Sequence, residues 1–271
     1  VSSLAQTAPS ATMSPATGIS DQSTSMVRGA SPPPPVNRTA EMAVPLAATG
    51  MTVAASDACN GKQSPNLTTT EKLYSGMVLA PMVRCGTLPL RALALRMGCQ
   101  TAWGEELVAL KLVSCRRVEN RQLNTVDFVC PDTLKRGNDG GSCKGGGSGG
   151  CVVLRTCRRI ECGRMICQLG AATPEIALAA AKVVEGDVDG IDVNMGCPKP
   201  FSVQGGMGAA LLALPDTAEA IVRILAENLS VPVSAKIRLL PTRAETVAFA
   251  VRLAHAGARC VTVHCRFPAQ R

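Results

Sequence analysis

Short apolar segments typical of β-strands alternate with longer segments of helical periodicity from residue 77 onward. The strand-like segments are 77–82, 101–106, 164–169, 190–195, 231–237 and 260–265, and the helical ones are 87–97, 174–185, 215–228 and 242–256. This alternation predicts an α/β fold in which parallel strands are joined by right-handed helical crossovers. We expect a TIM-type (β/α)8 barrel, of which this chain holds about six strands.

A complete barrel of this type has about eight strands, so the last two would lie beyond Arg271. The chain begins with Val1 and stops just past its last strand-like segment, and we interpret it as a fragment. An open, doubly wound sheet is the alternative, but it needs a glycine-rich phosphate-binding turn after its first strand. Here that strand leads into Ala80-Pro81-Met82-Val83-Arg84, which favours the barrel.

The barrel segment, 73–271, is preceded and interrupted by segments without hydrophobic periodicity. Residues 1–72 are rich in Ser, Thr, Ala and Pro, with consecutive prolines at 32–35, and we expect this extension to be disordered. Its few acidic residues suit an organellar targeting role, although arginine is also sparse. Residues 133–150 form an insertion rich in Gly, Ser and Lys, which we expect to be a flexible surface loop. A strand-like apolar run at 152–154 follows it.

Charge and cysteine content limit the class of protein. Residues 1–72 hold four basic and four acidic residues, so the whole net charge of +8 lies in the remainder. A basic folded part suits a polyanionic partner such as RNA, with solubility as the alternative explanation. The 13 cysteines are scattered and show no CxxC pair, which favours reduced thiols in an intracellular protein.

The sequence also disfavours a metal site and a membrane-spanning segment. Cys157, Cys162 and Cys167 are spaced by five residues, and the two histidines are far away in sequence, so we expect no metal site. We also expect no membrane span, because no apolar run reaches about 18 residues.

Polar residues stand near the carboxyl ends of four strand-like segments, where (β/α) barrels place their chemistry. These residues are Gln168, Asn194, Lys236 and His264. Side chains alternate along a strand, so Asn194 shares a face with Asp192, and Lys236 shares a face with Ser234. Each has a structural alternative: a strand cap, a turn residue, a lysine that reaches solvent, or a buried histidine. Their convergence at one rim favours a site.

Cys197 follows the fourth of these strands, between Gly196 and Pro198, and a glycine-rich turn comes after it at Gly205-Gly206-Met207-Gly208. A thiol in such a loop can act as an acid or a nucleophile, and the glycines let backbone approach a ligand closely. Glu105-Glu106 end the second strand. One of these carboxylates can face the site while the other pairs with a basic neighbour.

Several motifs, in this order and spacing, resemble those of the tRNA-dihydrouridine synthases, and the similarity covers about residues 74–266. The eukaryotic branch that modifies position 20 of the D-loop is the most similar. The motifs are Leu79-Ala80-Pro81-Met82-Val83, Glu105-Glu106-Leu107, Gln168-Leu169-Gly170, Asp192-Val193-Asn194-Met195-Gly196-Cys197-Pro198-Lys199, Gly205-Gly206-Met207-Gly208-Ala209-Ala210-Leu211, Lys236-Ile237-Arg238 and Val263-His264.

The resemblance implies a TIM-barrel enzyme in which FMN, reduced by NADPH, passes hydride from N5 to C6 of a uracil base. It implies that Cys197 is the general acid that protonates C5. Gln168, Lys236 and His264 match flavin-contacting positions, Ala80, Pro81 and Met82 would line the flavin, and Asn194 would serve both flavin and uracil. Lys199 and Arg238 are expected to contact the substrate.

The partner implied by the resemblance is tRNA, whose target base would leave its stack to reach the flavin. We expect a monomer in the cytoplasm, with the nucleus or a mitochondrion as alternatives. The chain departs from the family in the insertion at 133–150 and at Cys265, which stands where a glycine is usual. It also ends before the strands whose loops would hold the FMN phosphate and lacks the helical tRNA-binding domain, so the fragment itself can be inactive. Two other functions stay open: a flavin barrel that reduces a small molecule, and a non-catalytic RNA-binding barrel.

Overall fold

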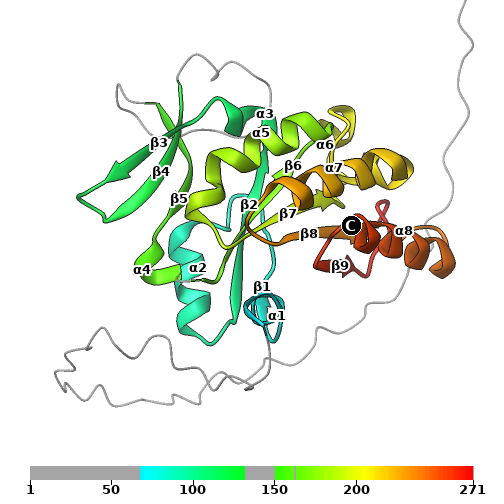
Figure 1. The fold of residues 1–271 in the computed structure, drawn as a ribbon, viewed down its shortest axis with the longest axis horizontal. Helices are drawn as coiled ribbons and strands as arrows, with labels where there is room; N and C mark the ends of the chain where they lie inside the picture. Colours follow the sequence, from blue (N-terminus) through cyan, green and yellow to red (C-terminus); the bar gives the residue numbers. More distant parts are fainter. Residues whose placement is uncertain (1–67, 132–149, 162, 271) are drawn as a thin grey trace, which may run out of the picture. The chain divides into compact units, whose positions relative to one another are not determined.

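A six-stranded parallel sheet forms the centre of the protein. The computed structural model describes residues 68–131, 150–161 and 163–270. The strands follow one another in sequence order, β1-β2-β6-β7-β8-β9 (Figure 1). Their bounds are Val78–Leu79, Thr101–Val108, Met165–Gly170, Gly190–Met195, Val233–Arg238 and Cys260–His264. A doubly wound sheet reverses its strand order at a switch point, whereas this order runs in one direction, as it does in a (β/α) barrel. The predicted fold class is confirmed.

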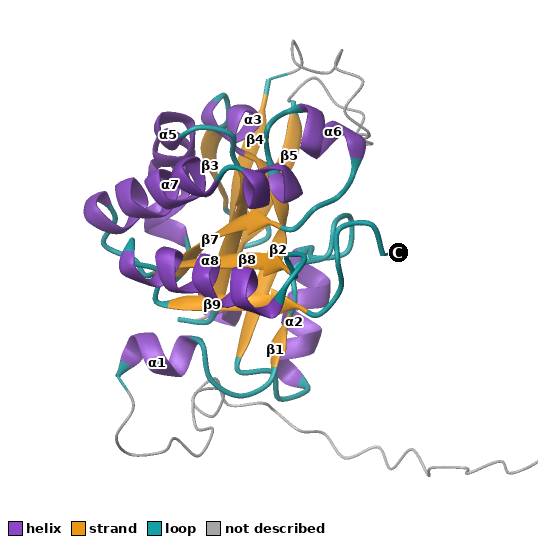
Figure 2. Cartoon of the chain, turned by 90° about the vertical axis from the view of Figure 1, so that its right-hand side faces the viewer, coloured by secondary structure: helices purple, strands orange, loops and turns teal. Residues whose placement is uncertain are grey.

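The four predicted helices are present, each within two residues of the expected bounds. They are α2 (Leu88–Arg96), α5 (Pro174–Val184), α7 (Pro215–Asn228) and α8 (Arg243–His255). Two of them begin at threonine caps: Thr173 accepts a hydrogen bond from the Ile176 amide, and Thr242 forms a capping box with Glu245. Helices α5, α7 and α8 lie side by side along one face of the sheet (Figure 2).

Short helices complete the connections. These are α1 (Thr69–Leu73), α3 (Ala109–Val113), α4 (Arg158–Glu161) and α6 (Pro200–Gln204), with 3-10 turns at Glu185–Asp187 and Gly208–Ala213. Helix α1 has a capping box between Thr68 and Glu71, so regular structure begins a few residues before the boundary that we expected at residue 72. The rest of the extension lies outside the described residues.

The two faces of the sheet differ in chemistry, as the alternation of side chains predicts. Ile191, Val193 and Ala235 are fully buried in the main hydrophobic core with apolar residues of α5 and α7. The residues between them, Asp192 and Ser234, are also fully buried but polar. The helix-covered face therefore supplies hydrophobic stabilisation, and the opposite face carries the polar groups.

A second sheet, which the sequence pattern did not predict as a whole, follows β2. Its antiparallel strands are β3 (Arg116–Asn120), β4 (Thr125–Cys130) and β5 (Cys151–Thr156) (Figure 1). Only the apolar run at 152–154 was expected to be a strand. The insertion expected at 133–150 falls almost entirely outside the described residues. Cys151, at the start of β5, is disulfide-bonded, so the expectation of uniformly reduced thiols is wrong there, whereas nine other described cysteines are free.

A buried ion pair joins α2 to α4, the short helix that follows the second sheet. Arg91 of α2 donates from Nε to Glu161 Oε1 at 2.6 Å, and both side chains are at most 2% exposed. The other guanidinium nitrogens donate to the carbonyls of Gly86 and Arg155, and Glu161 Oε2 accepts from the Cys157 amide. Every charge in this cluster has partners, as burial requires.

We predict that Arg91→Met destabilises the protein by about 3–5 kcal/mol, because it leaves the Glu161 carboxylate buried without its charge partner. The exposed pair between Arg158 and Asp189 offers the control, and Arg158→Met should cost no more than about 1 kcal/mol. Urea unfolding monitored by circular dichroism gives both free energies of unfolding. Equal losses for the two variants would contradict the prediction.

Candidate active site

Strand register places the predicted polar residues at one end of the sheet. Parallel neighbours in register point to the same face. Asn194 of β7 is paired with Lys236 of β8, and one layer further along Arg238 of β8 is paired with His264 of β9. Gln168 of β6 is paired with Asp192 of β7. All four strand-end residues named from the sequence therefore line the non-helical face toward the carboxyl ends of their strands.

A chain of hydrogen bonds links three strands beneath this rim. Asp192 accepts from Ser234 Oγ at 2.6 Å and from Gln168 Nε2 at 2.8 Å. Gln168 Oε1 in turn accepts from Asn194 Nδ2 at 3.2 Å. Burial raises the pKa of Asp192, whereas the hydrogen bonds from Ser234 and Gln168 lower it. Because each amide can donate only from its nitrogen, the acceptor at Asp192 fixes the orientation of Gln168 and then that of Asn194.

Asn194 holds the loop that carries Cys197. Its Oδ1 accepts hydrogen bonds from the backbone amides of Gly196 and Cys197, both at 2.9 Å. The loop is closed from the other side by Ala209, whose amide donates to the Cys197 carbonyl. Gly208 has a φ of 59°, and a Cβ there would lie 2.7 Å from the Cys197 carbonyl oxygen and 2.9 Å from its Cβ. Glycine is thus required beside the thiol.

Arg238 acts on the same loop. Its Nε donates to the Gly196 carbonyl at 2.7 Å, and its Nη1 donates to the carbonyls of Phe267 and Gln270. The structure therefore gives Arg238 a role in holding two loops at the rim, which the sequence did not suggest.

Glu106 faces the interior of the rim beside Cys197. A bulge in β2 lets Glu106 pair in register with Gln168, so the two side chains share a face. Neither Glu106 carboxylate oxygen is exposed or has a hydrogen-bond partner among the described residues. Burial raises the pKa of Glu106, and the Cys197 thiol lowers it. Glu105 lies apart from this pair: it accepts from the Arg84 amide at 2.7 Å.

Lys236 and Arg238 place positive charge at this rim, close to the imidazole of His264. Burial lowers the pKa of Lys236. The charge of Arg238 lowers this pKa further, whereas the charge of Asp192 raises it. Burial also lowers the pKa of His264, and the nearby Lys236, Arg238 and Arg266 lower it further. Within the described ranges, no ion pair or hydrogen bond joins the Lys236 ammonium to another side chain. A partly buried cation of this kind is suited to an electron-rich or anionic ligand.

The remaining predicted contact residues border this area. Ala80, Pro81 and Met82 follow β1 at the same end of the sheet, and Met82 is 41% exposed. Lys199 is exposed and precedes the first residue of α6. Cys265 is exposed, and its thiol lies 3.8 Å from the Val263 carbonyl oxygen. The structure does not test the roles assigned to these side chains, and these roles stay predictions.

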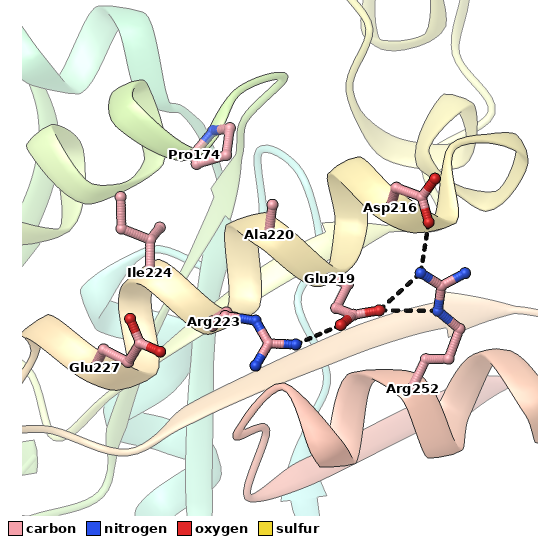
Figure 3. A pocket seen from close by; sticks show the side chains of 8 residues that line it. All are labelled: Pro174, Asp216, Glu219, Ala220, Arg223, Ile224, Glu227 and Arg252. Atoms are coloured by element: carbon pink, nitrogen blue, oxygen red, sulfur yellow. Dashed lines mark hydrogen bonds and ion pairs between the residues drawn. The ribbon is translucent and has the colours of Figure 1, made fainter.

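A separate cavity of about 360 Å³ lies on the helical side of the sheet (Figure 3). Arg252 of α8 binds both Asp216 and Glu219 of α7 there, and Arg223 also pairs with Glu219. Four of the five charged side chains that line this cavity are therefore paired with one another. Its lining consists of Pro174, Asp216, Glu219, Ala220, Arg223, Ile224, Glu227 and Arg252, and it contains none of the predicted site residues.

The part of the chain that the structure describes lacks two other features. No group of three or more His, Cys, Asp or Glu side chains there could hold a metal ion. No helix there is long and apolar enough to cross a membrane.

Comparison with known proteins gives one consistent answer. Residues 152–271 match the family model described as "Dihydrouridine synthase (Dus)". The chain is 43% identical over 198 residues to the tRNA-dihydrouridine(20) synthase [NAD(P)+] of Saccharomyces cerevisiae, and 44% identical over 201 residues to that of Schizosaccharomyces pombe. Residues 152–271 of this chain therefore belong to the dihydrouridine synthase family. The family match includes every strand-end residue from Gln168 to His264, and Cys197 as well.

The alignments cover only part of this chain and only part of each yeast relative. Each of the two alignments covers 71% of the chain, and they span 49% and 38% of the length of the two relatives. A human protein named tRNA-dihydrouridine(20a/20b) synthase [NAD(P)+]-like is 25% identical over 207 residues. The chain thus spans half or less of the length of the two yeast relatives.

We predict that Lys236→Met leaves the free energy of unfolding unchanged or raises it by up to about 1 kcal/mol, because it removes a partly desolvated cation that lacks a direct partner. Lys182→Met is the control: Lys182 binds Glu185 at 2.9 Å, and its loss should cost up to about 1 kcal/mol. Urea unfolding of both variants tests the contrast. A larger loss for Lys236→Met would show that this lysine supports the fold rather than a ligand.

Proposed function

We propose that this protein catalyses the FMN- and NADPH-dependent reduction of a uridine in the tRNA D-loop to 5,6-dihydrouridine. The observation that carries the proposal is the Cys197 loop, whose backbone amide donates to Asn194 at the carboxyl end of β7, the end of the sheet where Lys236 of β8 and His264 of β9 also lie. The names of the yeast relatives, which contain tRNA, dihydrouridine(20) and NAD(P)+, support the same reaction.

The residues at the rim fit a flavin. Lys236 has no direct partner in the described part of the chain, so its ammonium can meet an electron-rich ring edge. Gln168, Asn194 and His264 would supply hydrogen-bonding groups along the adjacent strands. Ala80, Pro81 and the exposed Met82 would form the apolar border of the ring. When bound, reduced FMN would supply the hydride that adds to C6 of the uracil, with NADPH as the source of the electrons.

Cys197 would donate the proton that completes the reduction at C5. Burial raises the pKa of this thiol, whereas the Lys199 amide lowers it and the Glu106 carboxylate raises it again. A raised pKa keeps the sulfur protonated at neutral pH, which is the form that an acid needs. Charge that develops on the uracil carbonyl needs a hydrogen-bond donor, and we assign this role to Asn194 and Arg238, which would contact the substrate.

A tRNA partner agrees with the charge of the chain, whose net +8 lies wholly outside residues 1–72. The exposed Lys199 stands next to the thiol loop, where it can contact the phosphate backbone beside an extruded base. The protein would therefore act on an intracellular RNA.

Reduction of a small molecule by the same flavin chemistry is the competing function. The test uses the full-length protein and compares NADPH oxidation with unmodified tRNA, free uridine and a simple enone. We expect turnover with tRNA alone. Turnover with only the small molecules would reject the tRNA reaction, and a purified protein without flavin absorbance would favour a non-catalytic RNA-binding role.

We predict that Cys197→Ala in the full-length protein lowers dihydrouridine formation by about 10²–10⁴-fold while flavin stays bound, because only the proton donor is removed. Dihydrouridine in tRNA is measured by mass spectrometry, and bound flavin by its absorbance. Cys99→Ala is the matched control, since Cys99 precedes β2 at the opposite end of the sheet. Normal product formation by Cys197→Ala would exclude the acid role.

A further inference from the structure

Two buried polar side chains that the proposed reaction does not use lie against Cys197. Glu106 reaches it from β2, and Ser202 reaches it from α6. Both Glu106 carboxylate oxygens and the Ser202 hydroxyl are buried without a hydrogen-bond partner among the described residues. Buried polar groups are nearly always satisfied, so three such atoms around one sulfur need an explanation.

Tight packing confines both groups to this place. A Cβ on Gly170 would lie 2.6 Å from Glu106 Oε1, so the carboxylate sits directly over the backbone that ends β6. A Cβ on Gly208 would collide with both the Ser202 hydroxyl and the Cys197 side chain. The two glycines therefore make room for Glu106 and Ser202 beside the thiol.

We propose that Glu106 and Ser202 are positioning residues that control the proton of Cys197 from opposite sides. The Glu106 carboxylate disfavours a second negative charge beside it and so keeps the sulfur protonated before the reaction. The Ser202 hydroxyl can donate to the sulfur and so stabilises the thiolate that remains afterward. This inference rests on the proposed function, because it gives the pair a purpose in uracil reduction.

The proton and electron balance is simple. In the proposed reaction, hydride addition at C6 leaves an electron pair at C5 of the uracil. The S–H bond of Cys197 then breaks as the C5–H bond forms, and its electron pair stays on Sγ. The thiolate forms next to the negative charge of Glu106, which promotes its reprotonation by water, while the Ser202 hydroxyl donates a hydrogen bond to it until then.

Other charges near the thiol agree with this division of roles. Arg238, from β8, interacts electrostatically with Cys197 and holds the Gly196 carbonyl. On the loop itself, the Lys199 amide lowers the pKa of the thiol. Ser202 also lowers it, and Glu106 is the carboxylate that raises it. Removing Glu106 or Ser202 should therefore shift the titration of the thiol in opposite directions.

The experiment measures the rate at which iodoacetamide alkylates Cys197 between about pH 6 and 11, a range that spans the usual thiol pKa, by mass spectrometry of its peptide. In Glu106→Gln the midpoint should fall by about one pH unit, because the neighbouring negative charge is gone. In Ser202→Ala it should rise, because the donor to the thiolate is lost. Glu105→Gln is the matched control and should leave the midpoint unchanged, since Glu105 binds the Arg84 amide instead.

Cys167 reports whether each variant stays folded. This thiol is fully buried, and burial raises its pKa to about 12, so it should resist alkylation in every folded variant. Should Glu106→Gln expose Cys167, Glu106→Asp takes its place: its shorter side chain draws the charge back, and the midpoint should fall by a smaller amount. A Cys197 midpoint that does not change in the folded Glu106 variant overturns the proposal, as does a fall in Ser202→Ala.

The alkylation result is independent of the reaction itself. If the tRNA reaction is wrong, the shifted midpoints remain but no dihydrouridine forms. If the reaction is right and the pairing is wrong, dihydrouridine forms with the same pH dependence in the wild type and Glu106→Gln. When both hold, the alkaline limb of the pH–rate profile of Glu106→Gln moves to lower pH, in the same direction as its alkylation midpoint.

Discussion

The hydrogen bonds that Asp192 accepts inside the sheet determine how the rim is built. The carboxyl group of Asp192 accepts from the nitrogen of Gln168, which leaves the oxygen of Gln168 to accept from Asn194. Asn194 then presents its own oxygen to the amides of Gly196 and Cys197. The orientation of each amide follows from the one before it. The conformation of the loop that carries Cys197 thus depends on the buried carboxyl group of Asp192.

This arrangement also shows how the fold separates stability from chemistry. The face of the sheet against α5 and α7 is closely packed and apolar, whereas the opposite face contains Asp192, Ser234 and Lys236. Their burial costs free energy, which the helical face offsets through hydrophobic contact. Arg91 adds a second structural anchor, because it pairs with Glu161 of α4 and donates to the Arg155 carbonyl of β5, and so joins the antiparallel sheet to α2.

Much of the central sheet could be predicted from the sequence because its strands are short apolar segments that alternate with helical segments. The four long helices were also evident, since their apolar positions recur at helical spacing. The antiparallel sheet was not, because β3 reads Arg-Arg-Val-Glu-Asn and carries no clear pattern of buried positions. The Arg91–Glu161 pair joins residues 70 apart, a contact that local patterns do not reveal.

Local sequence patterns also predicted only part of the candidate site. Alternation correctly grouped Asn194 with Asp192 and Lys236 with Ser234, but it could not decide which of Glu105 and Glu106 faces inward. The bulge between Trp103 and Glu106 inserts an extra residue and changes the parity of the strand at that point. Ser202 was missed as well, because nothing in its local sequence marks a hydroxyl that approaches a thiol.

The division of each strand into a helix-facing and an interior side has an evolutionary consequence. Substitutions at positions such as Val193 and Ala235 alter packing against α5 and α7 without touching the rim. Changes at Asn194 or Lys236 alter the chemistry while most of the hydrophobic core stays intact. A lineage could therefore acquire a new substrate by mutating every second residue near the strand ends, and selection for thermal tolerance could act separately on the residues in between.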